Sequence, residues 1–175
     1  MKDKEDQSES EVNLQCIDAI EVSLFIEREG LRFYEKAARV VKHPKVREIF
    51  RSLAREEKEH IQSLKTKAEF LKPALLKKAR ARHDVEEFIA RELKGKVFPD
   101  ADDPEAGLAG VKTDLEALEL GIRSEQRSID MLSQLMQDER KIDVRAVFSH
   151  LLAEEKRHLA ALLEIKKSCL SNTGP

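Results

Sequence analysis

The 175-residue sequence has little of what several classes of protein require. Its two cysteines, Cys16 and Cys169, form no Cys-x-x-Cys pair, which excludes a four-cysteine iron or zinc site. The first residues, MKDKEDQSESE, are charged and contain no apolar stretch of the kind found in secretory signals. No apolar run approaches the roughly 20 residues that cross a bilayer. We therefore expect a cytoplasmic protein in a reducing environment, with no membrane partner.

Neither sign of charge dominates the chain. There are 32 basic and 34 acidic residues, and they are interspersed, so we expect no nucleic-acid partner. Tryptophan is absent, and aromatic residues make up only 5% of the sequence. Of the whole sequence, 41% is hydrophobic and 38% is charged, and this composition favours a helical protein of one domain.

Apolar residues at helical spacing predict four long helices. The first two cover about 14–41 and 45–72, where Pro44 opens the second and Pro73 is expected to end or kink it. The third is predicted to begin at Thr113, because TDLE is a capping-box sequence. Asp143 is the expected N-cap of the fourth.

The segments outside these helices set the predicted topology. We expect residues 1–12 to form a flexible tail and residues 13–170 to form one bundle. Residues 73–112 would be a long crossover with a short helix near 84–93, followed by the loop GKVFPDADDPEAGLAG. A long middle connection lets the second and third helices run parallel. The sequence thus predicts an all-α four-helix bundle with one crossover, the ferritin-like topology.

Two polar pairs interrupt the apolar faces of the second and fourth helices. The stretch AREEKEHIQSL carries Glu57 and His60, and LAEEKRHLAAL carries Glu155 and His158. A Glu and a His three residues apart lie on the same face of a helix, one turn apart. Each pair therefore presents a carboxylate and an imidazole to the side that should be buried.

The two pairs belong to an internal repeat with an offset of 98 residues. Glu27 and Glu125 have the same offset. Further identical residues share it, including Ala19 and Ala117, Val46 and Val144, Arg47 and Arg145, Phe50 and Phe148, and Leu64 and Leu162. The sequence is thus predicted to be a duplicated helix pair. Packing about a pseudo-two-fold axis would bring all six polar residues to one level.

Four carboxylates and two imidazoles at one level are typical of a di-iron or di-manganese site in a helical bundle. Without cations, the buried carboxylates would repel one another and take up protons. Two divalent cations balance their charge, and this mixture of ligands suits iron or manganese better than calcium or magnesium. A single Glu-x-x-His in a Glu-rich helix is weak evidence, but two copies in register with a duplicated Glu favour a metal site.

These residues also carry a resemblance to a known family. The segments FIEREGLRFYEKAA, REEKEH, GIRSEQRSIDML and AEEKRH resemble the rubrerythrin-like branch of the ferritin-like superfamily over residues 14–168. The resemblance implies two iron ions, with manganese as an alternative, bridged by Glu57 and Glu155. It implies the remaining roles as follows: Glu27 and His60 on one metal, Glu125 and His158 on the other, and Tyr34 as a catalytic hydrogen-bond donor beside them.

The chain departs from that family in two places. Full-length rubrerythrins have a C-terminal four-cysteine iron site that supplies electrons, and this sequence has no such segment. They also have a seventh carboxylate three residues after the Glu of the third helix, where this chain has Ser128. We therefore expect a short form with a symmetric six-ligand site that receives electrons from a separate protein.

Three functions follow as hypotheses. The leading one is an oxidoreductase that reduces hydrogen peroxide or dioxygen, and the alternative is ferrous iron binding and oxidation for storage or delivery. The third is a binding module that has lost catalysis, which the intact ligand set disfavours. A homo-oligomer, a dimer or larger, is expected in each case.

Several neighbours of the predicted ligands allow two interpretations. Small residues lie one turn from the Glu residues of the first and third helices: Ser23, Gly30, Gly121 and Ser128. They indicate either close helix packing or room for a small oxidant. Glu56 and Glu154 precede the ligands directly, and we expect them to be solvated or to lie around the ligands.

Overall fold

A computed structural model describes residues 14–75, 81–99, 108–137 and 139–171. Within these ranges the chain is helical and contains no strand, so the all-α prediction is confirmed. The elements are α1 Cys16–Val40, α2 Pro44–Leu75, α3 Ala81–Phe88 with a π-helical turn at Ile89–Leu93, a 3-10 turn at Leu108–Gly110, α4 Asp114–Gln137 and α5 Ile142–Ser171.

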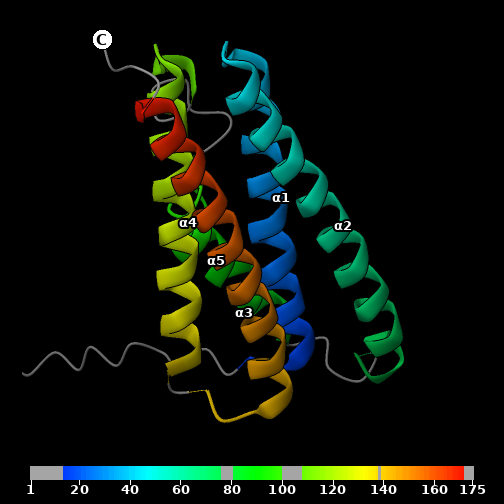
Figure 1. Ribbon diagram of the computed structural model, residues 1–175. Helices are drawn as coiled ribbons and strands as arrows, with labels where there is room; N and C mark the ends of the chain where they lie inside the picture. Colours follow the sequence, from blue (N-terminus) through cyan, green and yellow to red (C-terminus); the bar gives the residue numbers. More distant parts are fainter. Residues whose placement is uncertain (1–13, 76–80, 100–107, 138, 172–175) are drawn as a thin grey trace, which may run out of the picture.

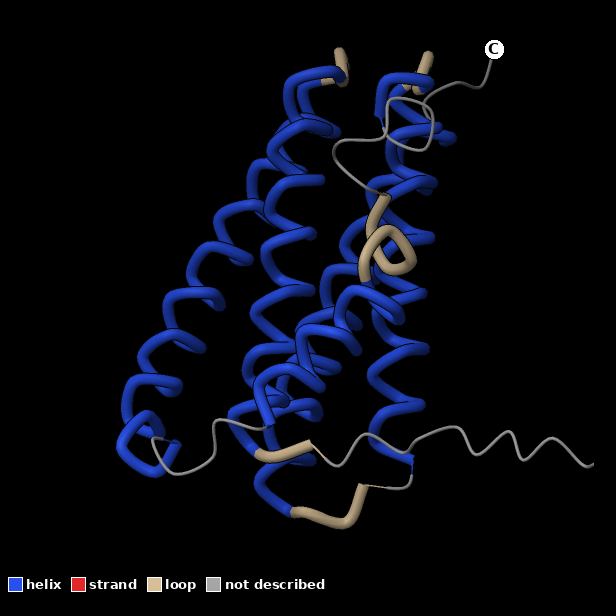
Figure 2. The backbone as a smooth tube through the Cα atoms, turned by 180° about the vertical axis from the view of Figure 1, so that it is seen from behind, coloured by secondary structure: helices blue, strands red, loops and turns tan. Residues whose placement is uncertain are grey.

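The long helices form two antiparallel pairs. Figure 1 shows α1 and α5 running in one direction and α2 and α4 in the other. Helix α1 packs mainly on α2, and α4 packs mainly on α5, while contacts of α1 with α4 and α5 join the two pairs. Helix α3 and the π-helical turn lie diagonally across the back of the bundle and pack against α1 (Figure 2).

The connection between α2 and α4 contributes to the core. We interpreted residues 95–110 as loop, yet Phe98 is only 2% exposed. Its ring lies 5.8 Å from that of Phe33 and 6.1 Å from that of Tyr34. Burial of a large aromatic ring contributes about 2 kcal/mol of hydrophobic stabilisation. Phe98 and the buried Val97 therefore hold this part of the connection against the bundle.

The helix boundaries test the capping predictions. The start of α4 is confirmed: Thr113 Oγ1 accepts a hydrogen bond from the Glu116 N–H (3.1 Å), and the Glu116 carboxylate accepts one from the Thr113 N–H (3.3 Å). The prediction for Asp143 is wrong, because α5 begins at Ile142 and Asp143 lies within the first turn. An acidic side chain there still stabilises the positive end of the helix dipole.

Two other boundaries also differ from expectation. Helix α2 continues to Leu75, two residues beyond Pro73. A proline this close to the end removes only one of the last backbone hydrogen bonds. Helix α3 begins at Ala81 rather than near residue 84. The expected tail, 1–12, lies outside the described residues, and none of the described helices is long and apolar enough to cross a membrane.

Candidate metal centre

The structure brings the predicted ligands together from all four long helices. Each side chain comes from the helix face that the repeat predicted: Glu27 from α1, Glu57 and His60 from α2, Glu125 from α4, and Glu155 and His158 from α5. Five of the six are buried, with at most 2% of each residue exposed. The exception is His60, whose side chain is 20% exposed.

The ligand atoms fall into two groups that share one residue. Atoms of Glu27, Glu57 and His60 lie within 4.8 Å of one another, and so do atoms of Glu57, Glu125 and His158. Glu57 is thus common to two groups of atoms, each of which could hold a metal ion. Glu155 is outside both groups, but its carboxyl interacts with that of Glu125. The assignment of all six residues as ligands stays a prediction.

Buried polar atoms without hydrogen-bond partners indicate that the site fits metal ions. Among the described residues, the buried side-chain atoms without a hydrogen-bond partner are Glu27 Oε2, His60 Nδ1, Glu125 Oε2, Ser128 Oγ, Glu154 Oε2, Glu155 Oε2 and both nitrogens of His158. His158 Nδ1 lies 3.2 Å from Glu57 Oε1 and 3.7 Å from Glu125 Oε1, yet no hydrogen bond satisfies it. Because buried polar groups normally have partners, atoms that converge without bonding suit a cation between them.

The electrostatics of the centre favour the same conclusion. Burial raises the pKa of Glu57 and of Glu155 well above the usual range, and neighbouring carboxyls raise both further. Burial also raises the pKa of Glu125 to about 7. Burial lowers the pKa of His158, which keeps its imidazole neutral and able to coordinate. Without cations these carboxyls hold protons, so metal ions and protons compete for the site.

Two further carboxylates contact the histidines across the bundle. Glu154 Oε2 on α5 lies 3.3 Å from His60 Nε2 on α2, and Glu154 also pairs closely with Arg157. In the mirrored contact, Glu56 Oε2 lies 3.7 Å from His158 Nε2. A carboxylate beside the second imidazole nitrogen orients a metal-binding histidine. Glu56 and Glu154 have the offset of 98 residues, and that signal was available in the sequence.

Tyr34 supports the centre from the core side. Its side chain is completely buried, and its hydroxyl donates a hydrogen bond to Glu125 Oε1. The ring stacks on Phe50 at 5.9 Å and meets Phe33 edge-on at 5.3 Å. This aromatic packing fixes the hydroxyl, and the hydroxyl in turn fixes one oxygen of Glu125.

The two glycines beside the ligands are sites of close packing. A Cβ on Gly30 would lie 3.0 Å from Glu57 Oε1 and 3.3 Å from Phe98, so Glu57 fills the space beside it. A Cβ on Gly121 would lie 3.3 Å from both Leu162 and Phe33. At these two glycines the packing interpretation holds and the oxidant interpretation does not.

Gly30→Ala is expected to weaken metal binding at least tenfold while the fold survives. The added methyl displaces the Glu57 carboxylate, which can move in the metal-free protein but not when it holds a metal. Alanine is also the better helix former, by about 1 kcal/mol, so the metal-free protein should not lose stability. Metal titration and thermal unfolding measure the two effects. Gly110→Ala is the control, because no atom lies within 4 Å of a Cβ there; equal affinity in both variants would contradict the packing argument.

Fold and site together define a class of protein. Two helix pairs place a carboxylate–imidazole cluster with unpartnered buried atoms at the middle of a bundle, which is the architecture of two-metal carboxylate proteins. The chain belongs to the Rubrerythrin family, whose model matches residues 18–166. The predicted resemblance is thereby confirmed, and membership indicates a di-iron carboxylate protein from a family of oxidoreductases. Searches among curated proteins and among solved structures gave no match.

Proposed function

We propose that the protein is a di-iron oxidoreductase that reduces hydrogen peroxide or dioxygen with electrons from a separate donor protein. The observation that carries the proposal is the convergence of unpartnered carboxylate and imidazole atoms in two groups joined by Glu57. Two bound iron ions would supply one electron each, and peroxide that accepts two electrons and two protons becomes two molecules of water.

The chain's own residues would prepare the centre for this chemistry. Glu57 would contribute ligand atoms to both metal ions, because it belongs to both groups. Tyr34 keeps a proton at Glu125 Oε1 within the buried core. Glu154 would hold the imidazole of His60 in orientation, and Glu56 lies near His158 Nε2 without a hydrogen bond to it. The exposed edge of His60 makes that half of the centre the side nearer to solvent, and we propose that the oxidant arrives there.

Two measurements test the proposal. Tightly bound metal is measured per chain after anaerobic loading with ferrous iron and desalting, and about two ions are expected. The loaded protein is then mixed rapidly with hydrogen peroxide, and its oxidation is followed by absorbance. Oxidation no faster than in buffer controls would refute peroxide reduction, and failure to retain iron, manganese or zinc would favour a binding module.

The alternative is ferrous iron oxidation for storage or delivery. The partial exposure of His60 favours it, since an iron ion that passes through the centre needs a route in and out. This function predicts turnover of many irons per chain and assembly into a cage. A dimer on gel filtration that holds only two irons would favour the reductase instead.

A further inference from the structure

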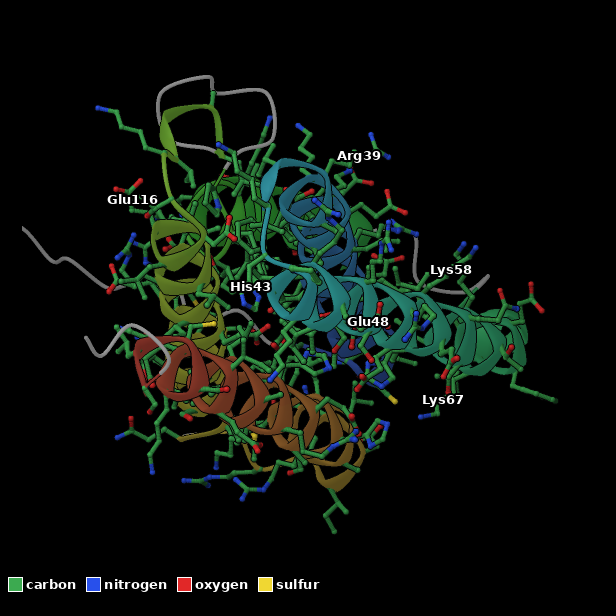
Figure 3. The ribbon with its side chains drawn as sticks, turned by 45° about the horizontal axis from the view of Figure 1, so that its top comes forward. Arg39, His43, Glu48, Lys58, Lys67 and Glu116 are labelled. Carbon is green, nitrogen blue, oxygen red and sulfur yellow. The ribbon has the colours of Figure 1, made fainter. Side chains whose placement is uncertain are left out.

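An arginine-lined groove lies on the outer side of the α1–α2 pair. It encloses about 570 Å³, and its charged lining consists of Glu35 and Arg39 from α1 and Arg47, Arg51 and Arg55 from α2. Figure 3 shows Arg39 on the side of this pair that faces away from α5. Ala38 and Ala54 complete the lining, and their short side chains leave the space between the guanidinium groups open.

The guanidinium groups are only partly used by the fold. Arg47 donates a hydrogen bond of 2.8 Å to the Val41 carbonyl, and Arg55 forms a long ion pair of 3.5 Å with the exposed Glu48. No hydrogen bond or ion pair joins Arg39 or Arg51 to any other described residue. The lining has four arginines and one carboxylate, that of Glu35, and Glu48 pairs with Arg55 beside it, so the groove keeps an excess of positive charge although the whole chain has a net charge of −2.

The internal repeat shows which of these arginines the fold requires. Arg47 corresponds to Arg145, which also donates to backbone carbonyls, those of Met136 and Glu139, at the connection between its helices. This arginine is therefore structural in both halves.

The other three arginines are not repeated. Their counterparts, at the same offset of 98 residues, are Gln137 for Arg39, Ser149 for Arg51 and Ala153 for Arg55. The second helix pair is also formed, without these charges. The positive charge of the groove is therefore a property that the first pair has and its copy lacks.

We propose that this groove binds a small anion that carries two or more phosphate groups. Arginine presents several N–H donors in a planar fork that matches the oxygens of a phosphate, and all four cations of the lining are arginines. The volume lies within the range of small-ligand sites, about 300–1,000 Å³. The lining contains no aromatic residue that could stack on a base, so the phosphates are the part of the ligand that is recognised.

An acidic protein surface is the other occupant that the charge would suit. The small ligand is favoured, because arginines from two helices border one volume of about 570 Å³. The proposal concerns a site separate from the metal centre and does not depend on its activity.

The test replaces the three unrepeated arginines with the residues of the second half. Pyrophosphate is titrated calorimetrically into the full-length protein and into the triple variant Arg39→Gln, Arg51→Ser, Arg55→Ala. A control variant removes three exposed cations elsewhere: Arg123→Gln, Arg140→Gln and Lys167→Gln. Both variants keep the carboxylate–histidine centre, so any binding of pyrophosphate by metal there is the same in all three proteins.

The native protein should bind pyrophosphate, the groove variant should bind it at least tenfold more weakly, and the control variant should stay within twofold. Added salt should weaken binding to the native protein and the control alike. No binding by the native protein, or an equal loss in both variants, would overturn the proposal. Equal binding of citrate would overturn the preference for phosphate, and binding of hexaglutamate without pyrophosphate would assign the groove to an acidic protein instead.

Discussion

Glu57→Gln is expected to lower tightly bound iron from about two ions per chain to fewer than one. Glu57 belongs to both groups of ligand atoms, so its loss affects both metal positions at once, whereas the loss of His60 or His158 affects one. The amide keeps the size of the carboxylate but has no negative charge with which to hold a cation. Elemental analysis after ferrous loading and desalting measures the effect.

The same substitution should stabilise the metal-free protein. Burial already disfavours the charged form of Glu57 and raises its pKa, and neighbouring carboxyls raise that pKa further. A neutral amide avoids this cost, and at pH 8 the free energy of unfolding should rise by on the order of 1 kcal/mol. Glu59→Gln, two residues further along α2 and exposed, is the control and should change neither property. Unchanged iron binding in Glu57→Gln would refute the ligand assignment.

The metal-free protein is expected to lose stability as the pH rises from about 4.5 to 7, whereas the metal-loaded protein gains it. Burial raises the pKa of Glu125 from 4.5 to about 7, so in this window the folded chain holds a proton that the unfolded chain has released. That protonation stabilises the fold fully below the unfolded pKa and is lost as the pH passes the folded one. The shift corresponds to about 3 kcal/mol for this single group.

The other ionisable groups of the centre modify this dependence without reversing it. The pKa values of Glu57 and Glu155 are raised as well, and they act in the same direction as Glu125. His158 acts in the opposite direction, because burial lowers its pKa and the unfolded chain binds the extra proton. His60 acts with the carboxyls, because the neighbouring Glu27 carboxylate raises its pKa, so His158 alone opposes the other four groups.

Metal ions reverse the sign because they bind the deprotonated carboxyls, so their affinity rises with pH. Thermal unfolding followed by circular dichroism between pH 4.5 and 8, with and without bound iron, measures both slopes. Glu125→Gln should flatten the slope of the metal-free protein. Parallel slopes with and without metal would contradict the competition between protons and cations.

The sequence predicted which residues of the four helices lie at the same height in the bundle better than it predicted where the helices begin and end. Helical spacing of apolar residues and the offset of 98 residues predicted that the six polar residues share one level, because a repeat constrains packing in both halves. The start of α4 was predictable since Thr113 and Glu116 bond to each other's backbone. Asp143 was misplaced because an acidic side chain is nearly as favourable in the first turn as at the N-cap.

The contributions that sequence patterns missed depend on distant contacts. Phe98 lies in a segment rich in turn-forming residues, and nothing local indicates that it packs beside Tyr34. Glu154 contacts His60, which is on a helix of the other pair. The closeness of Gly30 to Glu57 depends on how two helices cross, and a glycine in a helix has several equally common explanations.

The contact between Gly30 and Glu57 should also be visible in the evolution of the two positions. Any side chain at position 30 competes with the Glu57 carboxylate for the same volume, so selection for the carboxylate also selects for glycine. In relatives that keep Glu at position 57, glycine should accompany it, and in lineages that have lost the metals both positions should be free to drift. Paired variation at 30 and 57 would therefore mark, from genome sequences alone, which descendants have kept a working centre.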